Sequence, residues 1–151
     1  MKTTLLFLAV FLSATLFGQS SYLSNADEHF DKGEFTEAIA DYTSAIKINP
    51  DDAIAYFNRG LSYDNLGQYN EAIADYTSVI KINPDDAEAY LNRGDSYDNL
   101  GQYNDGIADY IKAIKINPNY AEAYYNRGNS YHDLGQYNNA IADYTLQSKP
   151  V

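Results

Sequence analysis

The feature that most constrains the fold of this chain is a sequence repeat with a period of 34 residues. Residues 53–86 and 87–120 are identical at 24 of their 34 aligned positions. A third copy begins at Ala121, and a more divergent copy occupies residues 19–52. A fixed period of this length is typical of solenoids, in which each unit covers the apolar face of its neighbour. The chain is therefore expected to form a repeat array and not an ordinary globular core.

Each copy predicts two helices joined by a turn. In residues 53–86, apolar side chains recur at helical spacing over 56–66 and again over 72–82. We expect Gly67 to end the first helix, because glycine readily adopts the left-handed conformation, and Asn70 to cap the second. Asn83 should end the second helix, because a residue before proline avoids helical geometry. Asp85 and Asp86 then stand where an N-cap and the electropositive start of the next helix favour carboxylates.

Bulky, small and aromatic residues recur at matching places in the copies. They are Tyr56, Gly60, Tyr63, Ala72, Tyr76, Val79 and Pro84 in one copy, and Tyr90, Gly94, Tyr97, Gly106, Tyr110, Ala113 and Pro118 in the next. This pattern closely resembles the tetratricopeptide repeat (TPR) family. The resemblance implies an all-α fold, a right-handed α-solenoid of stacked helix–turn–helix units. The units would be residues 19–52 (diverged), 53–86, 87–120 and 121–151 (C-terminally incomplete).

Two residues depart from this pattern. His29 replaces the aromatic residue in the first copy. Gly106 stands where the other copies have Ala38, Ala72 and Ala140. A glycine inside a helix costs roughly 1 kcal/mol relative to alanine. The second helix of the third copy is therefore predicted to be locally weaker.

Residues 1–18 differ in character from the repeats. Lys2 gives a positive start, and the nearly unbroken apolar run Thr4–Phe17 precedes polar Gln19. This layout is typical of a secretory signal peptide, and the run is shorter than the roughly 20 residues that a bilayer span requires. We expect cleavage after Gly18, or alternatively after Ser20. The predicted location is therefore the periplasm, the cell envelope or the extracellular space, with no stable membrane span.

Composition and motif spacing exclude several functions. The formal charge of −11 argues against binding to nucleic acid or anionic lipid. The absence of cysteine rules out disulfides, thiolate metal sites and a cysteine nucleophile. His29 and His132 lie in different copies, and no catalytic or metal-binding motif is present. We therefore expect no enzymatic activity, no cofactor and no metal.

Fourteen of the sixteen tyrosines occupy repeated positions, which predicts that they pack between helices. Tyr120 and Tyr125 lie outside these positions, and they are the sole residues that favour a carbohydrate-binding alternative.

The repeat also aligns arginines with aspartates. Arg59, Arg93 and Arg127 form one column, and Asp41, Asp75, Asp109 and Asp143 form another. We expect each arginine to pair with the aspartate of the preceding copy, namely Arg59–Asp41, Arg93–Asp75 and Arg127–Asp109. Such partly buried pairs would fix the register of adjacent repeats.

The resemblance also implies a concave groove, formed by the residues of the first helices that packing leaves free. The predicted groove residues are Ile54, Phe57, Asn58, Leu61, Asp64, Glu88, Leu91, Asn92, Asp95, Asp98, Glu122, Tyr125, Asn126, Asn129 and His132. They include carboxylates but neither Lys nor Arg. The predicted ligand is a basic or mixed peptide, held at the backbone by the asparagines. A merely solvated acidic surface is the alternative.

This groove does not resemble that of TPR proteins that grip the C-terminal carboxylate of chaperones. Those proteins use Lys and Arg beside the asparagines, where this chain has Ile54, Glu88, Glu122, Leu91 and Asp95. The predicted function is thus an exported, non-enzymatic module or scaffold that binds a protein or peptide. The alternative is a self-assembling protein, or a fragment of a larger TPR protein, that associates through an uncapped C-terminal end.

That end is the place where the fourth copy departs from the pattern, after Thr145. Ile141, Tyr144 and Leu146 would then be exposed, because repeat arrays normally need a polar capping helix.

Overall fold

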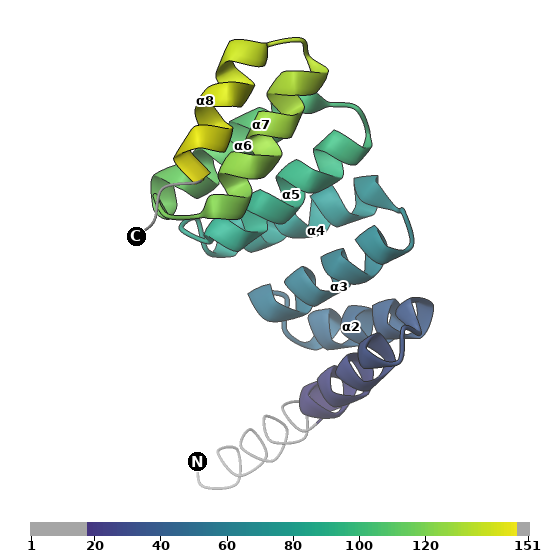
Figure 1. The fold of residues 1–151 in the computed structure, drawn as a ribbon. Helices are drawn as coiled ribbons and strands as arrows, with labels where there is room; N and C mark the ends of the chain where they lie inside the picture. The colour runs from purple at the N-terminus through teal and green to yellow at the C-terminus, as the bar shows by residue number, and fades with distance from the viewer. Residues whose placement is uncertain (1–17, 148–151) are drawn as a thin grey trace, which may run out of the picture. The chain divides into compact units, whose positions relative to one another are not determined.

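A computed structural model of the chain describes residues 18–147, with the side chains of residues 18–145. Within this range the regular structure is entirely helical, and the helices follow one another as helix–turn–helix pairs (Figure 1). The all-α prediction is confirmed. The expected signal peptide, except for Gly18, lies outside the described residues. The chain divides into two compact units after Gly67.

The first unit contains a helix over residues 18–31, α2 (Phe35–Ile48) and α3 (Ala53–Asn65). Its core consists of buried residues from all three helices: Ala26, Ala38, Tyr42, Ile46 and Ala55. Tyr42 is fully buried, and its hydroxyl donates to Asp27 Oδ1 at 2.6 Å. The repeated tyrosine thus packs between helices and keeps a partner for its polar end.

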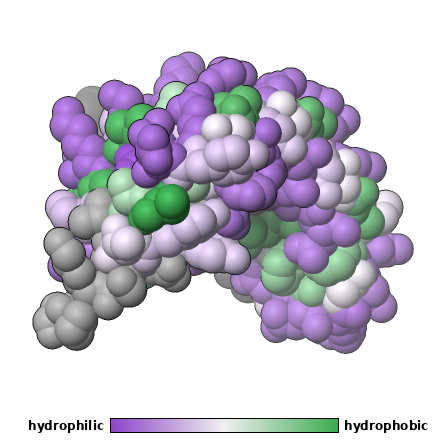
Figure 2. Space-filling model, turned by 45° about the horizontal axis from the view of Figure 1, so that its top comes forward, coloured by the Kyte–Doolittle hydropathy of each residue, from purple (hydrophilic) through white to green (hydrophobic). Residues whose placement is uncertain are grey.

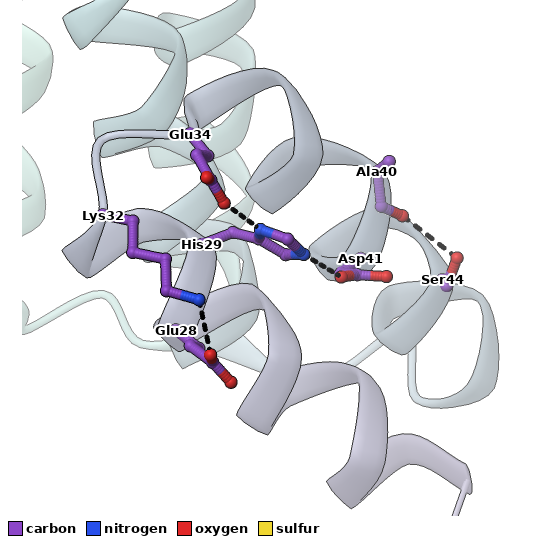
Figure 3. A network of polar contacts seen from close by, with 7 residues as sticks. All are labelled: Glu28, His29, Lys32, Glu34, Ala40, Asp41 and Ser44. Atoms are coloured by element: carbon purple, nitrogen blue, oxygen red, sulfur yellow. Dashed lines mark hydrogen bonds and ion pairs between the residues drawn. The ribbon is translucent and has the colours of Figure 1, made fainter.

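His29 connects the first two helices of this unit (Figure 3). Its Nδ1 lies 2.6 Å from Glu34 Oε2, and its Nε2 lies 3.8 Å from Asp41 Oδ2. The imidazole therefore replaces the aromatic contact of the other copies with polar contacts. Lys32 and Glu28 form an exposed ion pair at 2.6 Å on the same helix turn.

The second unit contains α4 (Tyr69–Ile82), α5 (Ala87–Asn99), α6 (Tyr103–Ile116), α7 (Ala121–Asp133) and α8 (Tyr137–Gln147). Each of these helices packs against the next one along the chain (Figure 1). Buried Leu91, Tyr110, Ala113 and Ala123 bring α5, α6 and α7 together in one core cluster. Each helix thus covers the apolar face of its neighbour, as the repeat predicts.

The helix boundaries confirm most of the predicted caps. Gly67 has a φ of 70°, a left-handed conformation that glycine adopts readily. Asp86 caps α5 by accepting from Ala89 N at 3.0 Å, and Asn83 is the C-cap of α4. The prediction for Asn70 is wrong. The N-cap of α4 lies two residues earlier than expected, at Gln68, which makes no side-chain hydrogen bond, and Asn70 lies inside the helix.

The predicted partners of Arg93 and Arg127 are also wrong. Arg93 makes two hydrogen bonds to Asp109, from Nε at 2.7 Å and from Nη2 at 2.8 Å. Arg127 binds Asp143 in the same two-pronged way. Each pair therefore joins the two helices of one repeat, and not two successive repeats.

The preceding repeat is contacted through a threonine. Arg93 Nη1 donates to Thr77 Oγ1 at 2.9 Å, and Arg59 Nη1 donates to Thr43 Oγ1 at 2.8 Å. The aspartate that had been assigned to Arg59, Asp41, faces His29. Arg59 and Arg93 thus do contact the preceding repeat, but through a hydrogen bond to a neutral hydroxyl group and not through an ion pair.

Hydrophilic residues cover most of the face drawn in Figure 2, and apolar residues appear there as small patches. Among the described residues, no helix combines the length and the apolar character that crossing a membrane requires.

Candidate functional site

The predicted groove residues are distributed over three helices. In the first unit, α3 carries Ile54, Phe57, Asn58, Leu61 and Asp64, of which Ile54 is 71% exposed and the others are partly buried. In the second unit, the remaining residues lie on α5 and α7. Glu88, Glu122 and His132 are exposed, while Asp95, Asp98 and Asn126 are partly buried. The polar part of the predicted site is therefore found in the second unit.

Leu91 is the exception among these residues. It is 4% exposed and belongs to the core cluster with Tyr110 and Ala123. Leu91 occupies the same position in its repeat as Phe57, so the sequence predicted that both would line the groove. Leu91 instead packs in the core. The prediction that Leu91 lines a groove is wrong.

A pocket in the second unit brings together side chains from α5, α6 and α7. Its lining residues are Asp95, Asp98, Asn99, Tyr103, Tyr110, Asn126, Asn129 and Asp133. These include three carboxylates and no cationic side chain. Four of them, Asp95, Asp98, Asn126 and Asn129, were predicted from the sequence. We name this set the acidic pocket.

Asp95 is held in the pocket by donors from two helices. Its Oδ1 accepts a hydrogen bond from Tyr110 OH on α6 and another from Asn126 Nδ2 on α7, both at 2.7 Å. Burial raises the pKa of Asp95 to about 6, although these two donors oppose the shift. At pH 7 the carboxylate is thus ionised at an energetic cost, which a cationic ligand would offset.

Asp98 lies on the other side of the same tyrosine. Tyr110 OH is 3.0 Å from Asp98 Oδ2, and Ser130 Oγ on α7 donates to that same oxygen. A phenol carries a single proton, so Tyr110 donates to one of the two carboxylates at a time. Burial raises the pKa of Asp98 as well. The two acids and Tyr110 therefore form one coupled group that binds protons more readily than isolated carboxylates do.

Tyr110 and Ser130 were not predicted as site residues, because both stand at repeated positions, and the repeated tyrosines were assigned to packing. A signal for Tyr110 was present in the spacing. The framework tyrosine fifteen residues after a polar groove position donates to it in other copies too, as Tyr42 does to Asp27 and Tyr144 to Asn129.

The residues outside the repeated pattern have different surroundings. Tyr125 is 47% exposed, and its ring lies 6.0 Å from that of Tyr144. Tyr120 packs against the core cluster of α5 to α7, and burial raises its pKa to about 12. Tyr120 is therefore used largely for packing, which weakens the carbohydrate-binding alternative.

The asparagines predicted to hold a peptide backbone already make contacts within the chain. Asn92 Nδ2 donates to the backbone oxygen of Glu88 at 2.9 Å, and Asn126 Nδ2 donates to Asp95. Each amide group retains a second N–H and a carbonyl oxygen for a ligand.

Among the residues that the structure describes, no group of three or more His, Asp or Glu side chains is arranged to hold a metal ion.

Family models and solved structures identify the fold. A model described as TPR repeat matches residues 26–67 and 94–135. Two models described as tetratricopeptide repeat match residues 53–86 and 76–108. No curated protein matches the chain.

Several solved structures are similar to the chain. The crystal structure of MamA protein has a TM-score of 0.82 and 28% identity, over 86% of this chain and 71% of that one. The Arabidopsis OM64 TPR domain has a TM-score of 0.75 and 24% identity, over 79% and 98% of the two chains. The first TPR of Spaghetti (RPAP3), bound to the HSP90 peptide SRMEEVD, has a TM-score of 0.74 and 23% identity, over 78% and 93%. The last two show similarity of fold alone.

The matched models cover both units, and the helix pairs, glycine turns and packed tyrosines follow the pattern of these models. The chain belongs to the tetratricopeptide repeat family.

Proposed function

We propose that this protein is a non-enzymatic interaction module that binds a basic or mixed-charge segment of a partner protein. The observation that carries the proposal is the acidic pocket between α5, α6 and α7, which has three carboxylates and no cation in its lining. Exposed Glu88 and Glu122 add negative charge to the same two helices, α5 and α7. A lysine or arginine of the partner would meet complementary charge there.

The proposed partner differs from a C-terminal carboxylate. Recognition of a carboxylate requires positively charged or N–H donors, whereas the exposed residues at the corresponding positions are Ile54, Glu88 and Glu122. A chain end with several acids would be repelled by this surface. We therefore assign the pocket to cationic side chains.

Export is part of the same proposal. The apolar run Thr4–Phe17, followed by polar Gln19, supports secretion with cleavage after Gly18 or Ser20. Expression with the native N-terminus and N-terminal sequencing of the exported protein would test it. Recovery of the full-length chain in the cytoplasm would contradict export and leave the binding proposal intact.

Charge reversal on the groove helices tests the binding proposal. Glu88→Lys combined with Glu122→Lys should abolish binding of a synthetic peptide of alternating lysine and alanine, measured by isothermal titration calorimetry. Both side chains are exposed, so the fold should survive the change.

The matched control is Asp85→Lys with Asp105→Lys, which changes the net charge equally at exposed positions that lie on neither α5 nor α7. This control should retain most of the affinity. Equal losses in both variants, or no binding by the unaltered protein, would refute the proposal.

Self-association is a second candidate, favoured by the exposed face of α8. Ile141 is 59% exposed, whereas its counterpart Ile107 in the preceding repeat is 8% exposed. Tyr137 on the same helix is also 59% exposed. Tyr144 is partly buried, contrary to expectation, and the side chain of Leu146 lies outside the described residues. Sedimentation velocity at high concentration should show oligomers that Ile141→Lys removes, and a monomer under all conditions would refute this candidate.

A further inference from the structure

Gly106 lies inside α6, at a position where the other copies have alanine. A Cβ atom built on Gly106 would lie 2.2 Å from Asp98 Oδ1 and 3.0 Å from Asp98 Cγ. It would also lie 3.0 Å from the backbone oxygen of Gly94. An alanine at position 106 is therefore incompatible with the observed position of the Asp98 carboxylate.

The Asp98 carboxylate occupies the space that the missing Cβ leaves. Its Oδ2 contacts Tyr110 on α6 and accepts from Ser130 on α7. Its Oδ1 is buried and has no hydrogen-bond partner among the described residues. The glycine thus allows an acid of α5 to turn inward and to meet side chains of the two following helices.

The fourth repeat shows what happens when alanine occupies this position. Ala140 is the counterpart of Gly106, and His132 is the counterpart of Asp98. The His132 side chain is 61% exposed and contacts neighbouring Asp133 and Tyr137. In this repeat, which has alanine in place of the glycine, the side chain therefore lies at the surface, whereas Asp64 of the second repeat, which has Ala72 at the same place, is partly buried.

We propose that Gly106 is a positioning residue of the acidic pocket, which holds Asp98 beside Asp95 so that the two carboxylates face one cationic side chain of the partner. The glycine then determines specificity through Asp98 and touches no ligand itself. This inference rests on the proposed function for the ligand. The positioning of Asp98 is inferred from the packing of α5 against α6 alone, so it is tested without any ligand.

Thermal unfolding of a set of variants tests the positioning. Gly106→Ala should lower the melting temperature in the unaltered chain, because Asp98 must leave its two donors. In an Asp98→Ala background the same change should raise the melting temperature, because alanine is the better helix former once the carboxylate is absent. Asp98→Asn is the matched control, since it keeps the bulk of the side chain and should leave Gly106→Ala unfavourable.

A titration of the Asp98 carboxyl carbon by NMR gives a readout that depends on position and not on stability. Burial raises the pKa of Asp98 in the unaltered protein. In Gly106→Ala the carboxylate should move toward water, and its pKa should fall toward the ordinary value for aspartate. An unchanged titration, or the same shift of melting temperature in all three backgrounds, would overturn the positioning of Asp98 by Gly106.

Binding of the lysine–alanine peptide tests the role in specificity, at a temperature where all variants are folded. Gly106→Ala should weaken binding about as much as Asp98→Ala, by roughly 5- to 50-fold for one lost charge-assisted contact. Adding Gly106→Ala to Asp98→Ala should change nothing further. Unchanged affinity in Gly106→Ala would refute the specificity role. Failure of the unaltered protein to bind would refute the proposed function, while the unfolding and NMR results would still decide the positioning.

Discussion

At the scale of single residues, the arginines show how one side chain connects several helices. The guanidinium of Arg93 lies 5.6 Å from the ring centre of Tyr90 and 6.0 Å from that of Tyr97. It also binds Asp109, and the two side chains are 17% and 7% exposed. Because both charges are largely removed from water, substitution of either partner would leave the other charge buried and unpaired, which lowers the free energy of unfolding. A double-mutant cycle with Arg93→Met and Asp109→Asn should therefore give a coupling energy of about 1–3 kcal/mol by urea unfolding.

The fourth repeat provides the control for this cycle. Arg127 and Asp143 should show a similar coupling, because they form the same two-pronged pair. Thr77→Val removes a hydrogen bond that Arg93 makes and that Arg127 lacks, because Ile111 occupies the matching position before Arg127. This substitution should therefore reduce the contribution of Arg93 to stability and leave that of Arg127 unchanged. A coupling near zero for Arg93 and Asp109 would mean that the pair adds nothing to the stability.

The partner of Arg93 illustrates what the repeat could not determine. Asp109 follows Arg93 by sixteen residues and lies on the second helix of the same repeat, whereas Asp75 precedes it by eighteen and lies on the second helix of the preceding repeat. A period of 34 residues aligns these columns but does not say toward which helix the side chain turns. The choice depends on side-chain packing between tyrosine rings, which no spacing in one sequence reveals.

Asp95 makes the stability depend on pH. Burial raises its pKa to about 6, above the ordinary value of 3.8, so the native state keeps a proton that the unfolded chain releases. This contribution is complete below pH 3.8 and is lost as pH rises through 6. Asp95→Asn should therefore stabilise the protein at pH 8 by about 1–2 kcal/mol, less than the shift alone implies because solvent reaches the group.

Asparagine is a suitable replacement because both donors bind the same oxygen, Oδ1, which the amide retains. Asn129 accepts from Tyr144 in this way in the fourth repeat. Urea unfolding of both proteins from pH 4 to 8 should show curves that separate between the unfolded pKa of 3.8 and the folded pKa of about 6, and that keep a constant separation above this range. The difference between the curves reports the loss of Asp95 together with the change that this loss causes in Asp98, which shares Tyr110 with it. Curves that stay parallel over the whole range would refute a raised pKa.

At the scale of helices, the caps were the most predictable feature. Asp52 and Asp86 hold the first turns of α3 and α5 through Ala55 N and Ala89 N. Asp86→Ala removes this hydrogen bond and should lower the free energy of unfolding by about 1 kcal/mol. Chemical denaturation at pH 7 measures the loss.

The control is Asp85→Ala at the neighbouring position. Asp85 is exposed and is not the N-cap, so this substitution removes the same charge without removing the capping hydrogen bond. Its effect should be within about 0.5 kcal/mol of zero. Similar losses in both variants would assign the effect to charge and not to capping. The sequence could locate these caps because the hydrogen bond is local, three residues apart. It could not place Asn70 correctly, because the start of α4 depends on the length of the turn after Gly67.

At the scale of the whole molecule, the periodicity predicted the fold and the distribution of charge predicted the kind of partner. Repeated apolar columns predicted the helices, because each helix must bury a face against the next. Asp95 and Asp98 were predicted as site residues because they are among the residues of the first helices that packing was expected to leave free. Tyr110 was assigned to packing and Gly106 was expected only to weaken its helix locally, because a column describes what the copies share and not which contacts one copy makes. The pocket forms where a residue shared by the copies, such as Tyr110, contacts a residue that differs between them, such as Asp95.

The net charge of −11 makes a further prediction about how partners associate. A basic peptide is attracted by the whole protein at long range and by the acidic surface at short range. Glu88→Gln with Glu122→Gln and, separately, Asp85→Asn with Asp105→Asn change the net charge equally, so both should lower the association rate similarly at low salt. At 1 M salt the screening length falls to about 3 Å, and only the first pair should still weaken binding, through faster dissociation. Stopped-flow kinetics at both salt concentrations measures this. Equal effects of the two pairs at high salt would mean that the peptide senses net charge alone, and that α5 and α7 present no local site.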